Sequence, residues 1–344
     1  SKKNAYIIAE VGHNHQGSME TAFELFKQAK IAGADAVKLQ KRDNKNLYTK
    51  SFFNEKYDNE NSFGTTYGQH REFLEFNLNQ YKELIEFAKE IQIDFFATPF
   101  DFPSVEFLEK LSMPAYKIAS ADLTNTPLQK EIAKTNKQIF LSTGGGSIED
   151  VKRAKENIFS INKNLAILHC TASYPAKVEE MNLSVLSTYK KEFPDIRIGL
   201  SDHENGIDAG PIAYMLGATI FEKHFTIDRS KKGTDHSFSL EPQGLTKFVR
   251  NIHRIQKMLG SPEKKILESE KKPLYKMKKS IVAKHDLNKG HIININDLNY
   301  KSPGGGLEPY KAETLIGKKL NKNLSMDDYI LSKDISWKEK KKLI

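Results

Sequence analysis

Residues 196–226 read IRIGLSDHENGIDAGPIAYMLGATIFEKHFT, and this stretch contains the unit from which the fold is predicted. Two short runs rich in apolar residues, Ile196–His203 and Thr219–Thr226, flank a segment that we expect to be helical. Their apolar residues are largely continuous rather than alternating, which suits strands of a parallel sheet that are covered on both faces. The stretch therefore predicts a strand–helix–strand unit in which polar residues stand at the end of each strand.

Six similar runs precede this stretch, and the segments between the runs have helical spacing. Met19–Ala32 and Tyr81–Ile91 show the pattern of amphipathic helices, and Leu245–Leu259 follows the last run as a further helix. Eight alternations of strand and helix predict an α/β fold, a (β/α)8 TIM barrel over residues 1–260. A doubly wound open sheet is the alternative, but no G-x-G-x-x-G motif follows the first run. The six runs are Tyr6–Gly12, Ala36–Gln40, Asp94–Phe100, Ala115–Ser120, Gln138–Gly144 and Leu165–Thr171.

The C-terminal part of the chain has a different pattern. Lysine-rich residues 261–278 are predicted to be a linker, residues 279–335 a small β-rich domain, and residues 336–344 a basic tail. The β-rich prediction rests on short apolar segments separated by Asn, Gly and Pro. These segments are Ser280–Ala283, Gly290–Ile295, Leu315–Gly317 and Tyr329–Leu331.

Charge and hydropathy narrow the possible partners. The chain of 344 residues has a formal net charge of +9, of which residues 261–344 carry +8. All 19 basic residues in that part are lysines, a composition that gives little support to nucleic-acid binding, so we expect no nucleic-acid partner. No apolar run approaches the roughly 18 residues of a membrane helix. We therefore expect a cytoplasmic protein without a membrane partner, whose single cysteine, Cys170, is a buried thiol.

Polar residues at the ends of the predicted strands mark the candidate site, because barrel enzymes build their active sites there. Lys38 and Lys117 provide positive charge, and the neighbouring strand ends provide hydroxyl groups. Such a face suits a small ligand that carries both a phosphate and a carboxylate. The hydroxyl groups belong to Thr98, Ser120, Ser142, Thr143 and Ser201.

Two histidines indicate a metal site. His203 and His224 end the seventh and eighth strands, which are neighbours in a closed barrel, and Glu10 and Glu222 stand at strand ends nearby. Two neutral imidazoles that converge on one point suggest a divalent metal ion with open coordination positions. Glu222 precedes His224 by two residues, so both side chains point to the same face of their strand.

Two long loops lie at the same end of the predicted barrel. Residues 41–78 follow the second strand and include Tyr67, and residues 227–241 follow the eighth strand and include Asp235. Loops of this length in a compact domain are more often functional than passive. Tyr67 and Asp235 are candidates for hydrogen bonds to the hydroxyl groups of a polyol.

In chain order, nine segments resemble those of sialic acid (N-acetylneuraminate) synthases, which condense phosphoenolpyruvate with an N-acetylated hexosamine. SFGTTYGQH and KGTDHSFSLEP look closer to the animal-type synthases, which prefer N-acetylmannosamine 6-phosphate. Residues 279–335 resemble the antifreeze-like (SAF) domain that ends the family's chains. The other segments are AEVGHNHQGS, AVKLQ, YKIASAD, LSTGG, HCTASYP, GLSDH and EKHFT.

The resemblance implies roles for individual residues. His203 and His224 would be the metal ligands, usually of manganese, with magnesium or cobalt as alternatives. Glu10, Glu222, Lys117 and Asp122 are expected to be catalytic. Lys38, Thr98, Lys117, Ser120, Ser142 and Ser201 match the phosphoenolpyruvate pocket, and Glu10, Gln40, Asp122, Tyr174 and Asp235 match residues around the sugar and the reacting carbons.

The resemblance also implies a domain-swapped homodimer, in which the small domain covers the partner's site. Many bacterial members carry an arginine there that reaches into the partner's site, and this chain has Ser302 instead. A 6-phosphate on the sugar would have Arg229, Lys231, Lys232 and the loop around His70 as candidate contacts.

The implied product is N-acetylneuraminate or its 9-phosphate, together with phosphate. Three alternatives remain open at this point. The chain could make a related nonulosonic acid, legionaminic or pseudaminic acid. It could be a metal-free aldolase that forms a Schiff base through Lys117 or Lys38, or a sugar-binding or ice-binding protein without activity.

Overall fold

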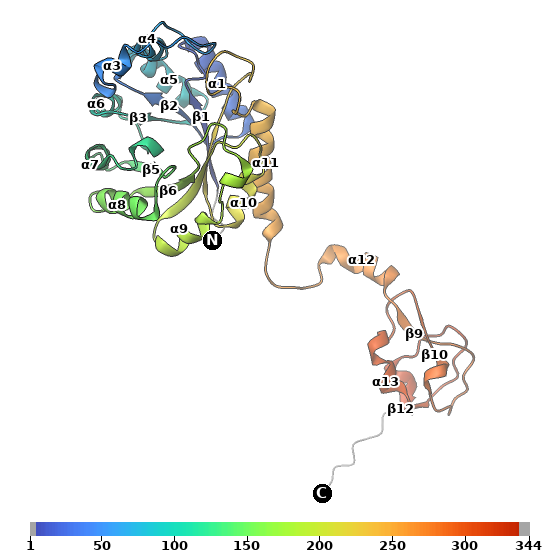
Figure 1. Ribbon diagram of the computed structural model, residues 1–344. Coiled ribbons are helices and arrows are strands. Elements are labelled where there is room, and N and C mark those ends of the chain that lie inside the picture. Colours follow the sequence, from blue (N-terminus) through green and yellow to red (C-terminus); the bar gives the residue numbers. More distant parts are fainter. Residues whose placement is uncertain (1–4, 337–344) are drawn as a thin grey trace. The chain divides into compact units, whose positions relative to one another are not determined.

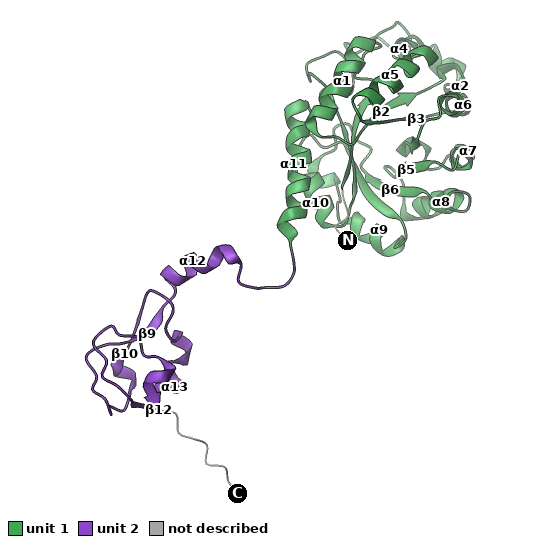
Figure 2. Cartoon of the chain, turned by 180° about the vertical axis from the view of Figure 1, so that it is seen from behind, with its two compact units in different colours: residues 1–260 green, residues 261–344 purple. Residues whose placement is uncertain are grey.

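The structure, a computed structural model, describes residues 5–336 of the chain. It forms two compact units, residues 1–260 and residues 261–344 (Figure 2). From residue 337 onward, the predicted basic tail lies outside the described residues.

The first unit is a closed barrel of eight parallel strands in chain order, as predicted (Figure 1). Pairing of β1 with β8 closes the barrel and places Glu10 opposite His224. Every predicted strand is present, and β4 ends two residues early because the chain turns into a short 3-10 helix at Ser120–Asp122. The strands are β1 (Tyr6–Gly12), β2 (Ala36–Lys41), β3 (Asp94–Pro99), β4 (Ala115–Ile118), β5 (Gln138–Ser142), β6 (Leu165–Cys170), β7 (Arg197–Asp202) and β8 (Ile220–His224).

Helices surround the strands on the outside of the barrel (Figure 1). Local capping groups set several of their ends. The side chain of Ser147 accepts a hydrogen bond from the Asp150 amide, which starts α8 with a capping box. The Asn77 side chain caps α5 in the same way, so that this helix begins three residues before the predicted start. The helices are α1 (Met19–Ala32), α2 (Asn44–Leu47), α3 (Lys50–Phe53), α4 (Tyr67–Phe73), α5 (Leu78–Glu90), α6 (Phe102–Lys110), α7 (Thr126–Lys134), α8 (Ile148–Phe159), α9 (Val185–Glu192), α10 (Ala209–Met215) and α11 (Pro242–Leu259).

The barrel interior is apolar near the N-terminal ends of the strands and polar near their C-terminal ends. Phe96 and Phe140 pack against each other inside the barrel, with ring centroids 5.2 Å apart, and Tyr6 stacks on Phe140. Because side chains alternate along a strand, the residue two positions after each inward apolar residue also points inward. In this way Phe96 is followed by Thr98, and Phe140 by Ser142, so the strand period places the polar residues above an apolar plug.

The second unit contains two small antiparallel sheets around its own apolar core. The segment predicted to be a linker contains a helix, because the Glu270 carboxylate accepts a hydrogen bond from the Leu267 amide and starts the first turn. Three of the four apolar segments predicted here are not strands. Gly290–Ile295 and Tyr329–Leu331 contain only isolated bridges, at Ile292 and Tyr329, and Leu315 ends a helix. The elements are α12 (Glu268–Met277), β9 (Ser280–Ala283), β10 (Leu298–Lys301), α13 (Ala312–Leu315), β11 (Lys319–Leu320) and β12 (Ile335–Ser336).

Among residues 5–336, no helix has the length and the apolar content that crossing a membrane requires.

Candidate active site

Lys38 lies at the centre of the polar part of the barrel. Its Nζ is 2.6 Å from Glu10 Oε2 and donates a hydrogen bond of 2.9 Å to Thr98 Oγ1. The register of β1 and β2 sets Glu10 directly beside Lys38, and β3 places Thr98 beside the end of β2. A buried ammonium group is thus held in place by partners from both neighbouring strands.

Glu222 joins the two predicted lysines. Its Oε1 is 3.4 Å from Lys117 Nζ and accepts a hydrogen bond of 3.1 Å from Ser201 Oγ, and its Oε2 is 3.8 Å from Lys38 Nζ. Burial opposes ionisation of Glu222, but the charges of Lys117 and Lys38 outweigh it and lower the pKa of its carboxyl to about 2. Burial also lowers the pKa of Lys117, a shift that the charge of Glu222 opposes. Two lysines, Lys38 and Lys117, and two carboxylates, Glu10 and Glu222, therefore form one network in which each residue is at most 4% exposed.

The predicted hydroxyl groups divide into two sets. Ser142 Oγ is buried without a hydrogen-bond partner, and Ser120 Oγ accepts a hydrogen bond from the Gly144 amide. Thr143 follows Ser142, and its hydroxyl instead donates to Leu168 O and accepts from Tyr189 OH on α9. The structure therefore brings Ser120, Ser142 and Ser201 to this face and leaves Thr143 outside it.

His203 and His224 approach each other from adjacent strand ends, with ring centroids 5.3 Å apart. His203 Nδ1 faces the carbonyl oxygen of Thr171 at 2.9 Å, so Nδ1 carries the proton and Nε2 keeps its lone pair. Burial, with a smaller effect from His224, lowers the pKa of His203 to about 3, so its ring is neutral at neutral pH. His224 Nδ1 is buried without a hydrogen-bond partner and lies 3.7 Å from Asp235 Oδ2.

Aromatic side chains surround this histidine pair. The ring centroid of Tyr174 lies 4.2 Å from that of His203, and Phe238 lies 4.9 Å from His224. Tyr174 is 57% exposed, so it stands at the mouth of the site rather than within it.

Gly12 marks the point where three of the predicted residues meet. A Cβ at this position would lie 3.4 Å from each of Asp235 Oδ2, Gln40 Nε2 and Glu10 Oε1. Gln40 Nε2 also donates a hydrogen bond of 2.7 Å to Glu10 Oε1. The positive φ of Gly12, +54°, and its missing side chain leave room for these groups at the end of β1.

Two predicted residues lie further from this centre. Asp122 Oδ1 accepts a hydrogen bond from Asn125, and burial raises the pKa of Asp122. Tyr67 OH accepts two hydrogen bonds from Arg71, at 3.0 and 2.9 Å, within the loop after β2. The contacts of the structure therefore link Tyr67 to the site only through Arg71.

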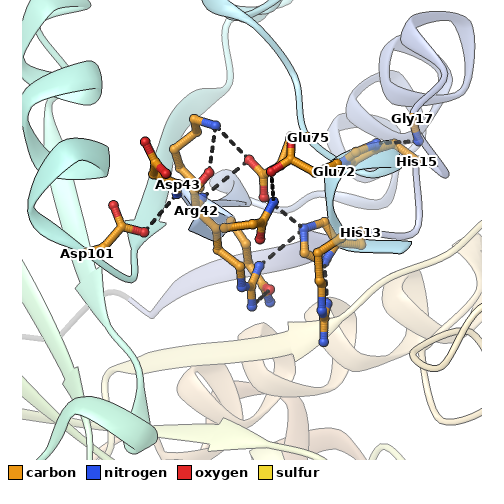
Figure 3. A network of polar contacts seen from close by, with 12 residues as sticks. His13, His15, Gly17, Arg42, Asp43, Glu72, Glu75 and Asp101 are labelled. Atoms are coloured by element: carbon orange, nitrogen blue, oxygen red, sulfur yellow. Dashed lines mark hydrogen bonds and ion pairs between the residues drawn. The ribbon is translucent and has the colours of Figure 1, made fainter. Parts of the chain in front are cut away.

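A polar network at the ends of β1 and β2 was missed by the sequence analysis (Figure 3). Arg42 Nη1 lies 3.2 Å from His13 Nε2, Arg42 Nη2 donates to Gln40 Oε1, and Lys41 pairs with Glu75 at 2.7 Å. The available signal was the position of Arg42, two residues after Gln40. It was overlooked because the strand was taken to end at Gln40.

A second unpredicted pair lies on the outer faces of β7 and β8. Lys223 Nζ is 2.7 Å from Asp202 Oδ2, and each residue is 1% exposed. These two residues pair in register, and each precedes one of the two histidines in sequence. The ion pair therefore joins the strands that carry His203 and His224.

Comparison with known proteins gives two matching family models. The NeuB family matches residues 25–264, and the SAF domain matches residues 278–336. The chain belongs to the NeuB family. Together with the closed barrel, this membership confirms the resemblance inferred from the sequence motifs.

Named relatives in the NeuB family differ in the sugar acid that they make. The human "N-acetylneuraminate-9-phosphate synthase" is 38% identical over 95% of this chain and 91% of its own length. The Campylobacter jejuni "N,N'-diacetyllegionaminic acid synthase" is 39% identical over 95% of this chain and 99% of its own. A solved N-acetylneuraminic acid synthetase from Leptospira borgpetersenii, in complex with citrate, is 32% identical, with a TM-score of 0.69 over 80% of this chain and 91% of its own. The chain thus belongs to the family of sialic acid and nonulosonic acid synthases, and these identities do not select the sugar.

Proposed function

We propose that this protein condenses phosphoenolpyruvate with an N-acetylated hexosamine to give a nonulosonic acid and inorganic phosphate. The observation that carries the proposal is the buried network of Lys38, Lys117, Glu10 and Glu222 beside the histidine pair. Two ammonium groups on one wall suit a ligand with two anionic groups, as phosphoenolpyruvate has. The unpartnered hydroxyl of Ser142 supplies a further donor on the same wall.

The histidine pair fits a divalent metal ion. His203 keeps a free Nε2, and His224 Nδ1 is a buried nitrogen without a hydrogen-bond partner. No group of three or more His, Cys, Asp or Glu side chains within residues 5–336 is arranged to hold a metal ion, so the pair would leave positions open for substrate and water. A bound manganese ion, or magnesium or cobalt in its place, would polarise the aldehyde carbonyl of the open-chain sugar.

Carbon–carbon bond formation begins with C3 of phosphoenolpyruvate attacking the aldehyde carbon of the sugar. Lys38 and Lys117 hold the phosphate and carboxylate so that C3 faces this carbon, and Asp235 and Gln40 orient the sugar hydroxyl groups. As the new bond forms, the C=C bond of phosphoenolpyruvate and the C=O bond of the aldehyde become single bonds. Positive charge develops at C2 of phosphoenolpyruvate, and the aldehyde oxygen takes up a proton to become a hydroxyl group. The carboxylates of Glu10 and Glu222 stabilise that charge, since both lie within contact distance of the lysines that hold the ligand.

Water then adds at C2, and its proton passes to a carboxylate oxygen of Glu222 or Glu10. In the free protein the two lysines hold Glu222 ionised with a low pKa, which makes it a weak base. An anionic ligand that engages the lysines removes part of this stabilisation and makes Glu222 a stronger base. Cleavage of the C–O bond finally releases phosphate, whose charge Lys38 and Lys117 neutralise, and leaves the keto group of the product.

The SAF unit is proposed to cover the active site of a second copy in a domain-swapped homodimer. In this unit, Ser302 Oγ donates to Met277 O and accepts from Lys279 Nζ, so its short side chain is tied within the unit. A cytoplasmic location remains a proposal that rests on the expected use of phosphoenolpyruvate.

Phosphate release tests the proposal. The full chain is incubated with phosphoenolpyruvate and N-acetylmannosamine, its 6-phosphate or the diacetamido trideoxy sugar of the legionaminic branch, with and without manganese. We expect metal-dependent phosphate release with at least one of these sugars. The legionaminic sugar is included because the C. jejuni relative is as similar as the human one. Metal-independent turnover that borohydride traps on a lysine would favour the Schiff-base aldolase and refute the proposal.

A further inference from the structure

Two guanidinium groups lie on opposite sides of the His13 ring, next to the proposed sugar pocket. Arg42 Nη1 is 3.2 Å from His13 Nε2, and Arg71 Nη1 is 3.3 Å from His13 Nδ1. Figure 3 shows Arg42 and His13 facing each other across this contact. Arg42 is 7% exposed, and Arg71 is partly buried.

The hydrogen bonds of this cluster do not balance. A neutral imidazole accepts a hydrogen bond at one nitrogen and donates at the other, so it can satisfy only one of the two guanidinium groups. Burial and the charges of Arg42 and Arg71 keep His13 neutral by lowering its pKa well below the usual value. One guanidinium therefore points a donor at another donor, an arrangement that an added acceptor would relieve.

The positive charge of the cluster also lacks a direct counterion. Arg42 Nη2 donates to the neutral amide oxygen of Gln40, and Arg71 donates through Nε and Nη2 to the phenol oxygen of Tyr67. Within the described part of the chain, no Asp or Glu lies at ion-pair distance from either guanidinium. Glu75 Oε2 contacts the backbone amide of Arg42 and the Lys41 ammonium, and its Oε1 lies 3.8 Å from His13 Nε2, so this carboxylate reaches the imidazole but neither guanidinium. Arg42 Cζ lies 3.8 Å from the Phe100 ring centroid and Arg71 Cζ lies 5.1 Å from that of Tyr67, which stabilises both cations in part. Neither ring is an anion, so an anion bound between the two arginines would supply the missing counterion.

The cluster joins the proposed sugar pocket. Gln40 links it to the site, since its carbonyl accepts from Arg42 and its amide donates to Glu10, both at 2.7 Å. Asp235 borders the same pocket: its Oδ2 lies 3.7 Å from His224 Nδ1, and this oxygen and Gln40 Nε2 would each lie 3.4 Å from a Cβ at Gly12. We consider a sugar that is bound with its aldehyde carbon at the histidine pair and its hydroxyl groups beside Asp235. The end of this sugar remote from the aldehyde would then lie at the two arginines.

Arg229, Lys232 and His70, three of the residues that the sequence suggested for a phosphate, have other partners, and the side chain of the fourth, Lys231, is exposed. Arg229 Nε donates to Ser237 O at 2.7 Å, and its Nη2 donates to Asn205. Lys232 Nζ lies 4.8 Å from the Phe63 ring centroid, and His70 Nδ1 accepts from the Phe63 amide. These contacts hold the two loops in place. The Arg42–His13–Arg71 cluster is a cationic group beside the pocket that is separate from Lys38 and Lys117, and Arg42 is bonded to Gln40.

We propose that Arg42, His13 and Arg71 bind a phosphate monoester at the end of the acceptor sugar remote from its aldehyde. The inference rests on the proposed function and selects within it the phosphorylated class of acceptor. Planar guanidinium groups present paired donors that match phosphate oxygens. A methyl or hydroxymethyl group at this end of the sugar would leave both charges without a counterion.

The test compares N-acetylmannosamine 6-phosphate with N-acetylmannosamine in the full chain, by phosphate release at varied concentrations of each substrate. We expect the wild-type protein to prefer the phosphorylated sugar. In Arg42→Gln and Arg71→Gln, kcat/KM for the phosphorylated sugar relative to the unphosphorylated one should fall about ten- to a hundredfold, the effect of losing a charge-assisted hydrogen bond. Lys45→Gln removes one positive charge from the same loop at an exposed position and should keep the wild-type ratio.

A binding measurement separates this inference from the proposed reaction. The reduced sugar N-acetylmannosaminitol 6-phosphate cannot react, and calorimetry should show that it binds the wild-type protein more tightly than the unphosphorylated alditol does. If no sugar supports phosphate release, the proposed function fails, and the alditol pair still tests the cluster. Equal binding of the two alditols, or an unchanged sugar preference in both arginine variants, would overturn the inference.

The KM for phosphoenolpyruvate, the folding of each variant and a conservative replacement of Arg71 show which role the arginines have. If the arginine variants raise only KM for phosphoenolpyruvate, the anion bound there belongs to that substrate and the inference is wrong. If Arg42→Gln does not fold, Arg71→Gln carries the test, because Arg71 is more exposed. Arg71→Lys should restore part of the preference, since lysine keeps the charge but not the paired donors.

Discussion

The ion pair between Lys223 and Asp202 offers a quantitative test of what holds β7 and β8, the strands that carry the histidine pair, together. The pair is fully buried, with 2.7 Å between Nζ and Oδ2. Asp202 Oδ1 also accepts from the Glu204 amide at 2.9 Å, and Lys223 Nζ donates to the Glu204 carbonyl. Replacing Lys223 by Met removes one charge and leaves the buried carboxylate of Asp202 unpaired.

The structure sets the size of the effect. At 2.7 Å and an effective dielectric constant of about 20, the attraction between two unit charges is about 6 kcal/mol. Desolvation costs several kcal/mol per ion and offsets much of this attraction, so the pair adds little relative to an apolar pair. Removing one partner keeps the desolvation cost of the other, and we expect Lys223→Met to lower the free energy of unfolding by about 3–5 kcal/mol.

Urea unfolding of the full chain, followed by far-ultraviolet circular dichroism, measures this loss in the barrel. The double variant Lys223→Met with Asp202→Leu should recover most of the lost stability, because it leaves no unpaired buried charge. Lys152→Met is the matched control. The Lys152–Glu192 pair has nearly the same length, 2.8 Å, but its side chains are 48% and 33% exposed, so solvent screens the pair and the expected loss is much smaller than in Lys223→Met. Equal losses in Lys223→Met and Lys152→Met would refute the reasoning.

Three further predictions concern the site and the loop after β1. His203→Ala and His224→Ala should each abolish phosphate release that depends on added manganese, and full activity of either variant after treatment with a chelator would contradict the metal assignment. Gly12→Ala should cost about 1–2 kcal/mol of stability, because its φ of +54° is unfavourable for alanine, and should raise KM for the sugar more than KM for phosphoenolpyruvate in the phosphate-release assay. Burial lowers the pKa of His15 from 6.5 to about 3, so its contribution to stability is fully present above pH 6.5 and is lost as the pH falls toward 3. His15→Asn keeps an acceptor for the Gly17 amide. In this variant the free energy of unfolding, measured in urea, should depend less steeply on pH over this range, by up to about 1.4 kcal/mol per pH unit. An unchanged slope would show that His15 does not titrate there.

The sequence was sufficient to predict the barrel and most of its inward polar residues. Both rest on local properties: continuous apolar runs indicate buried parallel strands, and the two-residue period fixes which side chains share a face. Once Phe96 and Phe140 fill the lower interior, the residues two positions later must line the open end. Thr98 and Ser142 follow from this rule, and the same alternation sends Thr143 to the opposite face, where it meets Tyr189.

Tertiary structure alone decided which residues meet across elements that are distant in sequence. His13 follows β1, Arg42 follows β2 and Arg71 lies on α4, and no periodic pattern in the sequence relates them. Their contact depends on how the loop of residues 41–78 packs on the barrel, which is a property of many long-range contacts together. The sequence by itself determined the strands, the barrel and the polar face, because these depend on neighbouring residues. The tertiary structure decided the arginine cluster and the Lys223–Asp202 pair, because buried charges find their partners only when separate segments are brought together.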